Sequence, residues 1–167
     1  MDRKSFARVE CPIARATDEV GDAWSLLILR SAFLGVRSFH GFEQRLGAPS
    51  STLARKLTQL CERGLLRRVR YRERPPRDEY LLSEKGRDLL PVLLALAAWG
   101  NRWLASEGAP LLLVNRHTGE PVEPVMVDAR TERRLKLGDV ALAAGPGASR
   151  ELARSLSRPI PFAAEEA

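Results

Sequence analysis

The sequence has few cysteines and no long apolar run. Its 2 cysteines among 167 residues, Cys11 and Cys61, lie too far apart to form a CxxC metal site or a disulfide framework. This cysteine usage is typical of the reducing cytosol. The longest apolar stretch, residues 89–99, contains a proline and is much shorter than the ~20 residues that a membrane-spanning helix requires. No apolar segment follows the charged N-terminal residues, so we expect no secretory signal and a cytoplasmic protein.

The sequence also has little of the chemistry that enzymes use. It contains 2 histidines, His40 and His117, and it has no paired carboxylates, Ser-His-Asp order, phosphate-binding glycine loop or set of metal ligands. We therefore predict a protein that is not an enzyme and that holds no cofactor or metal. With 44% hydrophobic and 29% charged residues, the composition is that of a globular protein, and the length suits one domain with an appendage.

Positive charge is concentrated in one segment of the chain. Residues 37–77 hold 11 Lys and Arg but only 3 acidic residues, a net charge of +8, whereas the whole chain carries +6. A local cationic block suits a polyanion, because each phosphate that is neutralised releases condensed counterions. The segment therefore favours nucleic acid as a partner, and the alternative is a solvated basic face without a partner.

Apolar spacing, capping residues and glycines predict the order of the elements. The expected helices span residues 12–20, 24–34, 39–46, 49–63 and 83–106, and the expected strands span residues 66–71 and 79–82. Shorter strands are expected at residues 111–114, 125–127 and 133–137. The chain then divides into a domain over residues 8–107, a small β extension over residues 108–145 and a mobile tail over residues 146–167.

The third and fourth helices are joined by a very short turn at Gly47, and a two-stranded ribbon follows them. This order is typical of a winged helix-turn-helix, a mainly α fold with a small β wing (α+β), whose second helix enters the major groove of DNA. At about 3.6 residues per turn, Leu53, Leu57 and Leu60 share one face of residues 49–63, and polar residues that can read base edges lie opposite. The alternative is an ordinary amphipathic surface helix. The expected DNA contacts of this helix are Ser50, Ser51, Thr52, Arg55 and Gln59, with Lys56 at the margin on phosphate.

The ribbon, over residues 66–82, is rich in arginine. Its arginines are Arg67, Arg68, Arg70, Arg72, Arg74 and Arg77. Arginine binds phosphate with paired hydrogen bonds and fits a narrow minor groove. We expect Pro75-Pro76 to stiffen the tip and the tip residues to contact the DNA backbone or minor groove: Arg72, Arg74 and Arg77. The alternative for Arg67 and Arg68 is a structural pairing with Glu79 or Glu84.

Several short motifs follow one another along residues 8–105. They are Cys11-Pro12-Ile13, Gly21-Asp-Ala-Trp24-Ser-Leu-Leu-Ile-Leu-Arg30, Leu46-Gly47, Gly64-Leu65, Tyr80-Leu81-Leu82-Ser83 and Leu90-Pro91. Taken together, this series resembles the HxlR-type transcriptional regulators, which are MarR-like winged-helix proteins of bacteria. The resemblance implies a homodimer that binds double-stranded operator DNA through residues 49–63 and through the wing, residues 66–82.

Two features depart from the family pattern. The recognition helix begins with Ala48-Pro49-Ser50, where family members usually have Ile-Ser or a similar pair, so contacts at this end can differ. Residues 108–167 extend past the usual end of the family, and their Arg116-His117-Thr118-Gly119 resembles an extension whose cysteine-bearing relatives look like zinc ribbons. Without a cysteine in this region, a tetrahedral cysteine site is excluded, and we expect a small β unit that packs on the dimer or lines a pocket.

Large apolar residues on the long helix predict a homodimer. Aromatic and aliphatic side chains of this size anchor interfaces, and a helix this apolar exceeds what the winged domain can cover. The alternative is that these residues cover only their own winged helix. The expected dimerisation residues are Leu89, Leu96, Trp99 and Trp103 of this helix, together with Ile13 and Val20 of the helix over residues 12–20, which would pack across them.

The sequence leaves open whether the regulator responds to a signal. Cys11 precedes a helix start, and Arg15 lies one turn further on, two features that lower a thiol pKa and favour oxidant sensing. The alternative is a small apolar residue beside the dimer helix. Cys61 is expected to be inert core. A small-molecule effector near the dimer helices or the extension is a further alternative.

Overall fold

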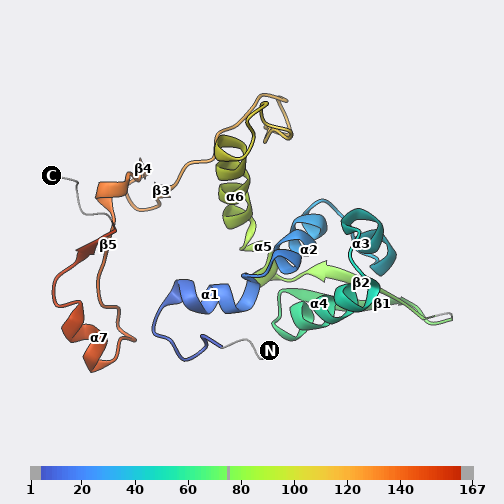
Figure 1. Ribbon diagram of the computed structural model, residues 1–167, viewed down its shortest axis with the longest axis horizontal. Coiled ribbons are helices and arrows are strands. Elements are labelled where there is room, and N and C mark those ends of the chain that lie inside the picture. The colour runs from blue at the N-terminus through green and yellow to red at the C-terminus, as the bar shows by residue number, and fades with distance from the viewer. Residues whose placement is uncertain (1–4, 75, 163–167) are drawn as a thin grey trace.

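The computed structural model describes residues 5–74 and 76–162. Figure 1 shows a body of helices with a protruding hairpin and a steeply rising helix, followed by a separate C-terminal extension. In order, the elements of the first part are α1 (Pro12–Val20), α2 (Ala23–Phe33), α3 (Phe39–Leu46), α4 (Ser50–Glu62), β1 (Leu66–Arg72), β2 (Arg77–Leu82), α5 (Glu84–Arg87) and α6 (Leu90–Trp103). The expected class, mainly α with a small β wing, is confirmed.

Polar caps and one glycine fix where the helices of the body begin and end. Asp22 caps α2 by accepting a hydrogen bond from the Ser25 amide at 3.0 Å, and Ser38 caps α3 by accepting one from the Gly41 amide at 3.1 Å. These side chains satisfy amides that have no partner inside the helix. Gly47 ends α3 with a φ of 59°, a left-handed conformation that glycine adopts without strain. The turn between α3 and α4 is therefore as short as the sequence predicts.

One apolar core holds α2, α3, α4 and the base of the wing together. Its fully enclosed side chains include Ile28 and Leu29 of α2 and Phe42 of α3. The predicted stripe of α4 is buried against them: Leu53, Leu57 and Leu60. Each such side chain contributes about 1.5–3 kcal/mol by leaving water. The core therefore fixes α4 with its opposite face turned outward.

The wing is an antiparallel pair of strands tied to the start of α3. β1 pairs with β2 in a register that places Leu66 opposite Leu82 and Arg68 opposite Tyr80. The amide of Tyr80 also donates to the carbonyl of Arg37 at 2.8 Å, which fastens the ribbon to the segment before α3. Both strands run further toward the tip than the sequence predicts. The wing is thus held at a fixed angle beside the helix-turn-helix.

The single long helix predicted over residues 83–106 is wrong. The structure divides it into α5, capped by Ser83, and α6, with the interruption at Asp88 and Leu89. Pro91 explains the break, because proline lacks the amide that a continuous helix needs and suits the first turn of a new one. Pro91 accordingly lies in the first turn of α6.

The C-terminal extension is made of very short elements. They are β3 (Val127–Asp128), β4 (Arg133–Arg134), η1 (Leu137–Asp139), β5 (Ala141–Leu142), α7 (Arg150–Ser155) and β6 (Ile160–Pro161). The strand expected at residues 111–114 is only an isolated bridge between Val114 and Pro121. The described part of the expected tail contains regular elements, because α7 lies there and β6 pairs with β5, whereas its mobility stays a prediction. Residues 163–167 of that expectation lie outside the described residues.

The helices are all too short or too polar to cross a membrane, as judged over the described residues. In Figure 1 the strands β3 to β5 and helix α7 lie to the left of α1 and α6, far from α3, α4 and the wing on the right. The winged helix-turn-helix and the extension therefore occupy opposite ends of the molecule.

Candidate nucleic-acid interface

The outward face of α4 carries the residues that the sequence places there. Ser51 and Arg55 are exposed, and Thr52 and Gln59 are half-buried at the edges of this face. Thr58 is exposed on the same helix and adds another hydroxyl that the sequence reasoning omitted. Hydroxyl, guanidinium and amide groups on one accessible helix face can reach the edges of bases in a major groove.

Lys56 differs from the others, because the structure gives it a partner inside the protein. Its side chain is buried, and its Nζ lies 2.9 Å from Oδ2 of Asp22, the residue that caps α2. Partial burial by itself would raise the pKa of Asp22, but the hydrogen bonds from Ser25 and Lys56 outweigh it and lower that pKa. The expected phosphate contact from Lys56 is therefore wrong: this lysine joins α4 to α2.

Ser50 also has a partner within the fold. Its hydroxyl donates to Oε1 of Glu43 on α3, and this hydrogen bond is the main reason that the pKa of Glu43 is lowered. His40 Nδ1 lies 3.6 Å from the other carboxylate oxygen of Glu43. Ser50 thus helps to set the angle between α3 and α4, and its hydroxyl is engaged in the unbound protein.

The arginines of the wing form two groups. Arg68 and Arg70 hold Asp78: the Arg68 Nε lies 2.7 Å from Asp78 Oδ2, and the Arg70 Nε lies 3.2 Å from Asp78 Oδ1. The hydrogen bond from Arg68 is the main cause of a lowered pKa at Asp78. The structural pairing expected for Arg68 therefore exists, but its acid is Asp78 rather than Glu79 or Glu84.

The second group lies at the tip. Arg72 turns its Nε toward the carbonyl of Arg74 at 3.1 Å, while Arg74 and Arg77 are exposed. Within the described part of the chain, no carboxylate forms an ion pair with these three guanidinium groups. Pro75, predicted to stiffen the tip, lies outside the described residues. The tip therefore presents positive charge that the protein itself does not neutralise.

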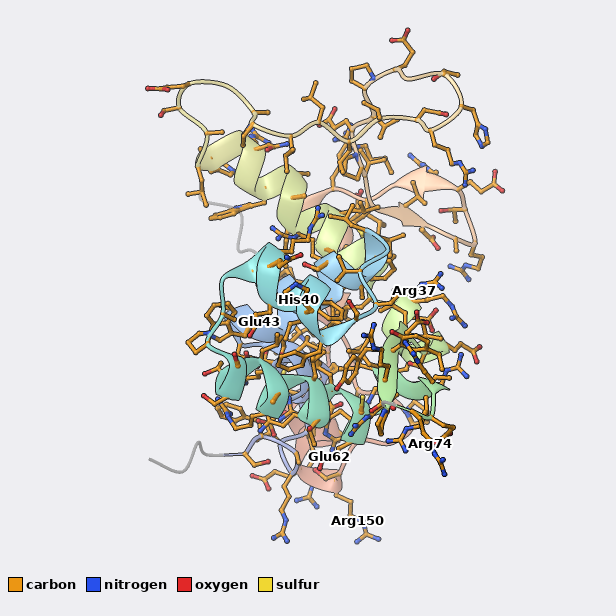
Figure 2. All side chains as sticks on the ribbon, turned by 90° about the vertical axis from the view of Figure 1, so that its right-hand side faces the viewer. Arg37, His40, Glu43, Glu62, Arg74 and Arg150 are labelled. Atoms are coloured by element: carbon orange, nitrogen blue, oxygen red, sulfur yellow. The ribbon has the colours of Figure 1, made fainter. Side chains whose placement is uncertain are left out.

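Figure 2 shows how these groups are arranged. It looks onto α4 from the side of the wing, with Arg37 and Arg74 projecting on the hairpin side of the helix and His40 on α3 above it. A hollow of about 640 Å³ lies between α3 and the wing, lined in part by His40, Arg77 and Tyr71. Arg37 is exposed and was missed by the sequence reasoning; its position directly before the cap of α3 could have indicated it.

The residues expected at a dimer interface separate into two sets. Val20 is only 8% exposed and lies in the core of the winged domain, and Leu89 is half-buried against that core, so part of its surface is still accessible. The other four are exposed in the single chain. These four are Ile13, Leu96, Trp99 and Trp103.

The cysteines lie in different settings. Cys11 occupies the position before the first turn of α1 and is half-buried. Cys61 packs against the core, and its burial raises the pKa of the thiol, as expected for an unreactive position. Across the described residues no cluster of three or more histidine, cysteine and acidic side chains could hold a metal ion. The backbone amide of His117 donates to the Asn115 side chain within a turn.

Comparison with known proteins gives a consistent result. The sequence pattern of the HxlR-like helix-turn-helix family matches residues 19–108. The chain is 40% identical over 144 residues to the HTH-type transcriptional regulator Rv3095 of Mycobacterium tuberculosis (strain ATCC 25618 / H37Rv), covering 86% of this chain and 91% of that protein. It is 39% identical over 111 residues to the HTH-type transcriptional regulator sll1512 of Synechocystis, covering 66% of this chain and 80% of that protein.

Some solved structures resemble most of the chain, and others resemble a smaller part of it. The crystal structure of PA1607 superposes with a TM-score of 0.78 at 36% identity, covering 85% of this chain and 100% of that chain. The structure of PA1374 from Pseudomonas aeruginosa has a TM-score of 0.65 at 41% identity, covering 87% of this chain and 100% of that chain. The redox regulator HypR in its reduced form has a TM-score of 0.53 at 28% identity, covering 58% of this chain and 99% of that chain.

Proposed function

Because this chain belongs to the HxlR-like helix-turn-helix family of transcriptional regulators, we propose that it binds operator DNA as a homodimer, with α4 in the major groove and the wing on the flanking backbone. The family and the relatives are regulators rather than enzymes. The proposal adds to that membership the groove, the residues and the stoichiometry.

The observation that carries the proposal is the pairing of two surfaces on one side of the molecule. The outward face of α4 offers Ser51, Thr52, Arg55 and Gln59, and the tip beside it offers guanidinium groups without an acidic partner among the described residues. A helix face of this chemistry can distinguish base pairs, whereas the tip can bind phosphates of any sequence. The two surfaces together therefore supply specificity and affinity.

A selection of bound fragments from a random DNA pool tests the proposal. We expect an enriched palindrome whose half-sites are about one helical turn apart, because a two-fold dimer presents two copies of α4 to successive major grooves. Binding should weaken steeply with added salt, since phosphate contacts release counterions. Enrichment of no sequence, or of a single non-repeated site bound by one chain, would contradict the proposal.

A redox-responsive form of the same regulator is the second candidate. Two observations favour it: the similarity to the redox regulator HypR and the partly accessible position of Cys11 before α1. Operator release after diamide treatment should then be lost in Cys11→Ser and kept in Cys61→Ser. An equal response of the wild type and both variants would rule out a redox role for Cys11. The small-molecule alternative rests on a hollow of about 760 Å³ beside Trp99 and Trp103, and it stays a prediction.

A further inference from the structure

Beyond α5 the chain has apolar side chains but no interior. Of the side chains described in residues 87–162, none is buried. Trp99 and Trp103 of α6 are 56% and 63% exposed, and Leu111, Leu112 and Met126 of the extension are 76%, 63% and 66% exposed. A chain in water does not leave so many large apolar groups uncovered without a partner for them.

The total exposed area supports the same conclusion. The chain exposes 13,347 Å², whereas a compact monomer of its 18.6 kDa would expose about 8,200 Å². The excess is larger than the ~1,000–2,500 Å² that each chain buries in an obligate homodimer. The exposed surface is therefore sufficient for an extensive interface.

Among the described residues, two side-chain hydrogen bonds join the extension to the rest of its own chain, and residues of the extension also line the hollow beside Trp99 and Trp103 of α6. Near its start, the Asn101 side chain of α6 donates to the carbonyl of Leu111 at 2.8 Å. Near its end, the amide of Ser149 donates to Oε1 of Glu10, before α1, at 2.8 Å. Residues 125–162, here called the arm, include Ser149, and Arg134 of the arm lines the hollow beside α6. Most of the arm nevertheless lies away from α6, to the left of α1 in Figure 1.

We propose that the arm packs against α6 of a second copy of this chain, and that the second copy's arm packs reciprocally against the first. The inference rests on the proposed homodimer and adds a segment that the winged domain does not supply. A second copy of the chain suits this role, because the apolar side chains are exposed in every single chain. A second copy is the partner that is always available in a one-to-one ratio. In a two-fold dimer each chain supplies one α6 with exposed tryptophans and one arm with few attachments to its own chain, so both apolar surfaces are buried at once.

Isotope-mixed photocrosslinking of the full-length protein tests the inference. A benzophenone amino acid replaces Val127 of the arm, and natural-abundance and ¹⁵N-labelled copies are unfolded and refolded together. We expect crosslinked peptides that join the arm to α6 with one light and one heavy member. The same amino acid at Val69 of the wing serves as a control and should give no link to α6. If both peptides of every crosslinked pair carried the same isotope, the arm would fold onto its own chain, and the inference would be overturned.

A pair of substitutions provides an independent measure. Met126→Glu in the arm should raise the dissociation constant of the dimer by about tenfold or more, because it places a charge in a buried contact. Leu34→Glu, at a position that is similarly exposed but outside α6 and the arm, should leave that constant within about twofold. Equal effects of the two substitutions would count against the arm.

The two proposals fail in different ways. A dimer with mixed-isotope links but without affinity for any DNA would support the arm and refute the proposed function. A dimer that binds a palindrome but gives only crosslinked pairs of the same isotope would support the proposed function and overturn the packing of the arm on a second copy. A chain that stays monomeric at every concentration would overturn both the arm and the homodimer.

Discussion

At the scale of single residues, positively charged side chains have different roles, according to whether an acidic side chain lies beside them. Lys56 is neutralised by Asp22, and Arg68 by Asp78, at 2.9 Å and 2.7 Å respectively. Arg55 and Arg74 point outward without such a partner among the described residues. The net charge of the segment therefore overstates the number of cations available to a polyanion, and the contacts decide which ones remain.

Arg55 and Arg74 should differ in how their loss affects binding. Arg55→Ala should relax the preference at one base pair by about 1–3 kcal/mol, because a bidentate contact to a base edge is lost. Arg74→Ala should weaken all sequences alike and reduce the dependence on salt by about one counterion. Competition binding at one salt concentration compares the specificities, and binding of one sequence at several salt concentrations measures the counterion release, with Arg130→Ala in the extension as a control for both. Identical specificity profiles for both variants would refute the assignment of α4 to the groove.

The pair of Lys56 and Asp22 should be visible in the pH dependence of stability. Because the folded pKa of Asp22 lies below its unfolded value of about 3.9, the pair stabilises the fold above about pH 4 and this contribution is lost as the pH falls through the folded pKa. Lys56→Met should cost roughly 2 kcal/mol at pH 7, and the difference from the wild type should shrink on acidification. Urea unfolding at pH 7 and pH 3 measures this, and a cost that is independent of pH would contradict it.

At the scale of elements, α5 packs closely against the backbone at Leu65 because residue 86 is a glycine and has no side chain. A Cβ at Gly86 would lie 2.1 Å from the carbonyl oxygen of Leu65, so α5 could not lie against the segment that joins α4 to β1. Gly86→Ala should therefore destabilise the fold by about 1–3 kcal/mol through overpacking. Gly138→Ala, where a Cβ meets open space, should change stability by less than about 0.5 kcal/mol. Thermal unfolding of both variants provides the measurement, and equal stability would show that the backbone yields.

The elements of the winged domain are those that short-range signals describe well. Ser38, Gly47 and Gly64 mark the ends of α3 and α4 by capping and backbone freedom, and the helix bounds follow them closely. The break between α5 and α6 was missed, although Pro91 carried the signal, because a continuous apolar pattern on both sides suggested one helix. The elements of the extension were poorly predicted, since strands of two residues have no periodicity to recognise.

At the scale of the whole molecule, the exposed tryptophans determine the expected assembly. Trp103 is 63% exposed in the single chain, so Trp103→Glu should leave the winged domain folded. In the proposed dimer it would bury a charge and weaken association by about 2 kcal/mol or more, giving monomers that no longer bind the operator tightly. Sedimentation at several concentrations tests this, and a variant that still sediments as a dimer would show that the interface lies elsewhere.

The sequence by itself determined the winged helix-turn-helix, because caps, glycines and apolar spacing act over a few neighbouring residues. It also determined which face of α4 is outward. Leu53, Leu57 and Leu60 share one face of a helix, and once that face is buried the opposite face must point to solvent. Only the tertiary structure decided that Lys56 and Asp22 form an ion pair, that Val20 is core and that most of the arm lies away from its own α6. These features depend on which distant segments meet, and burial and charge pairing between distant segments are set by packing rather than by local order.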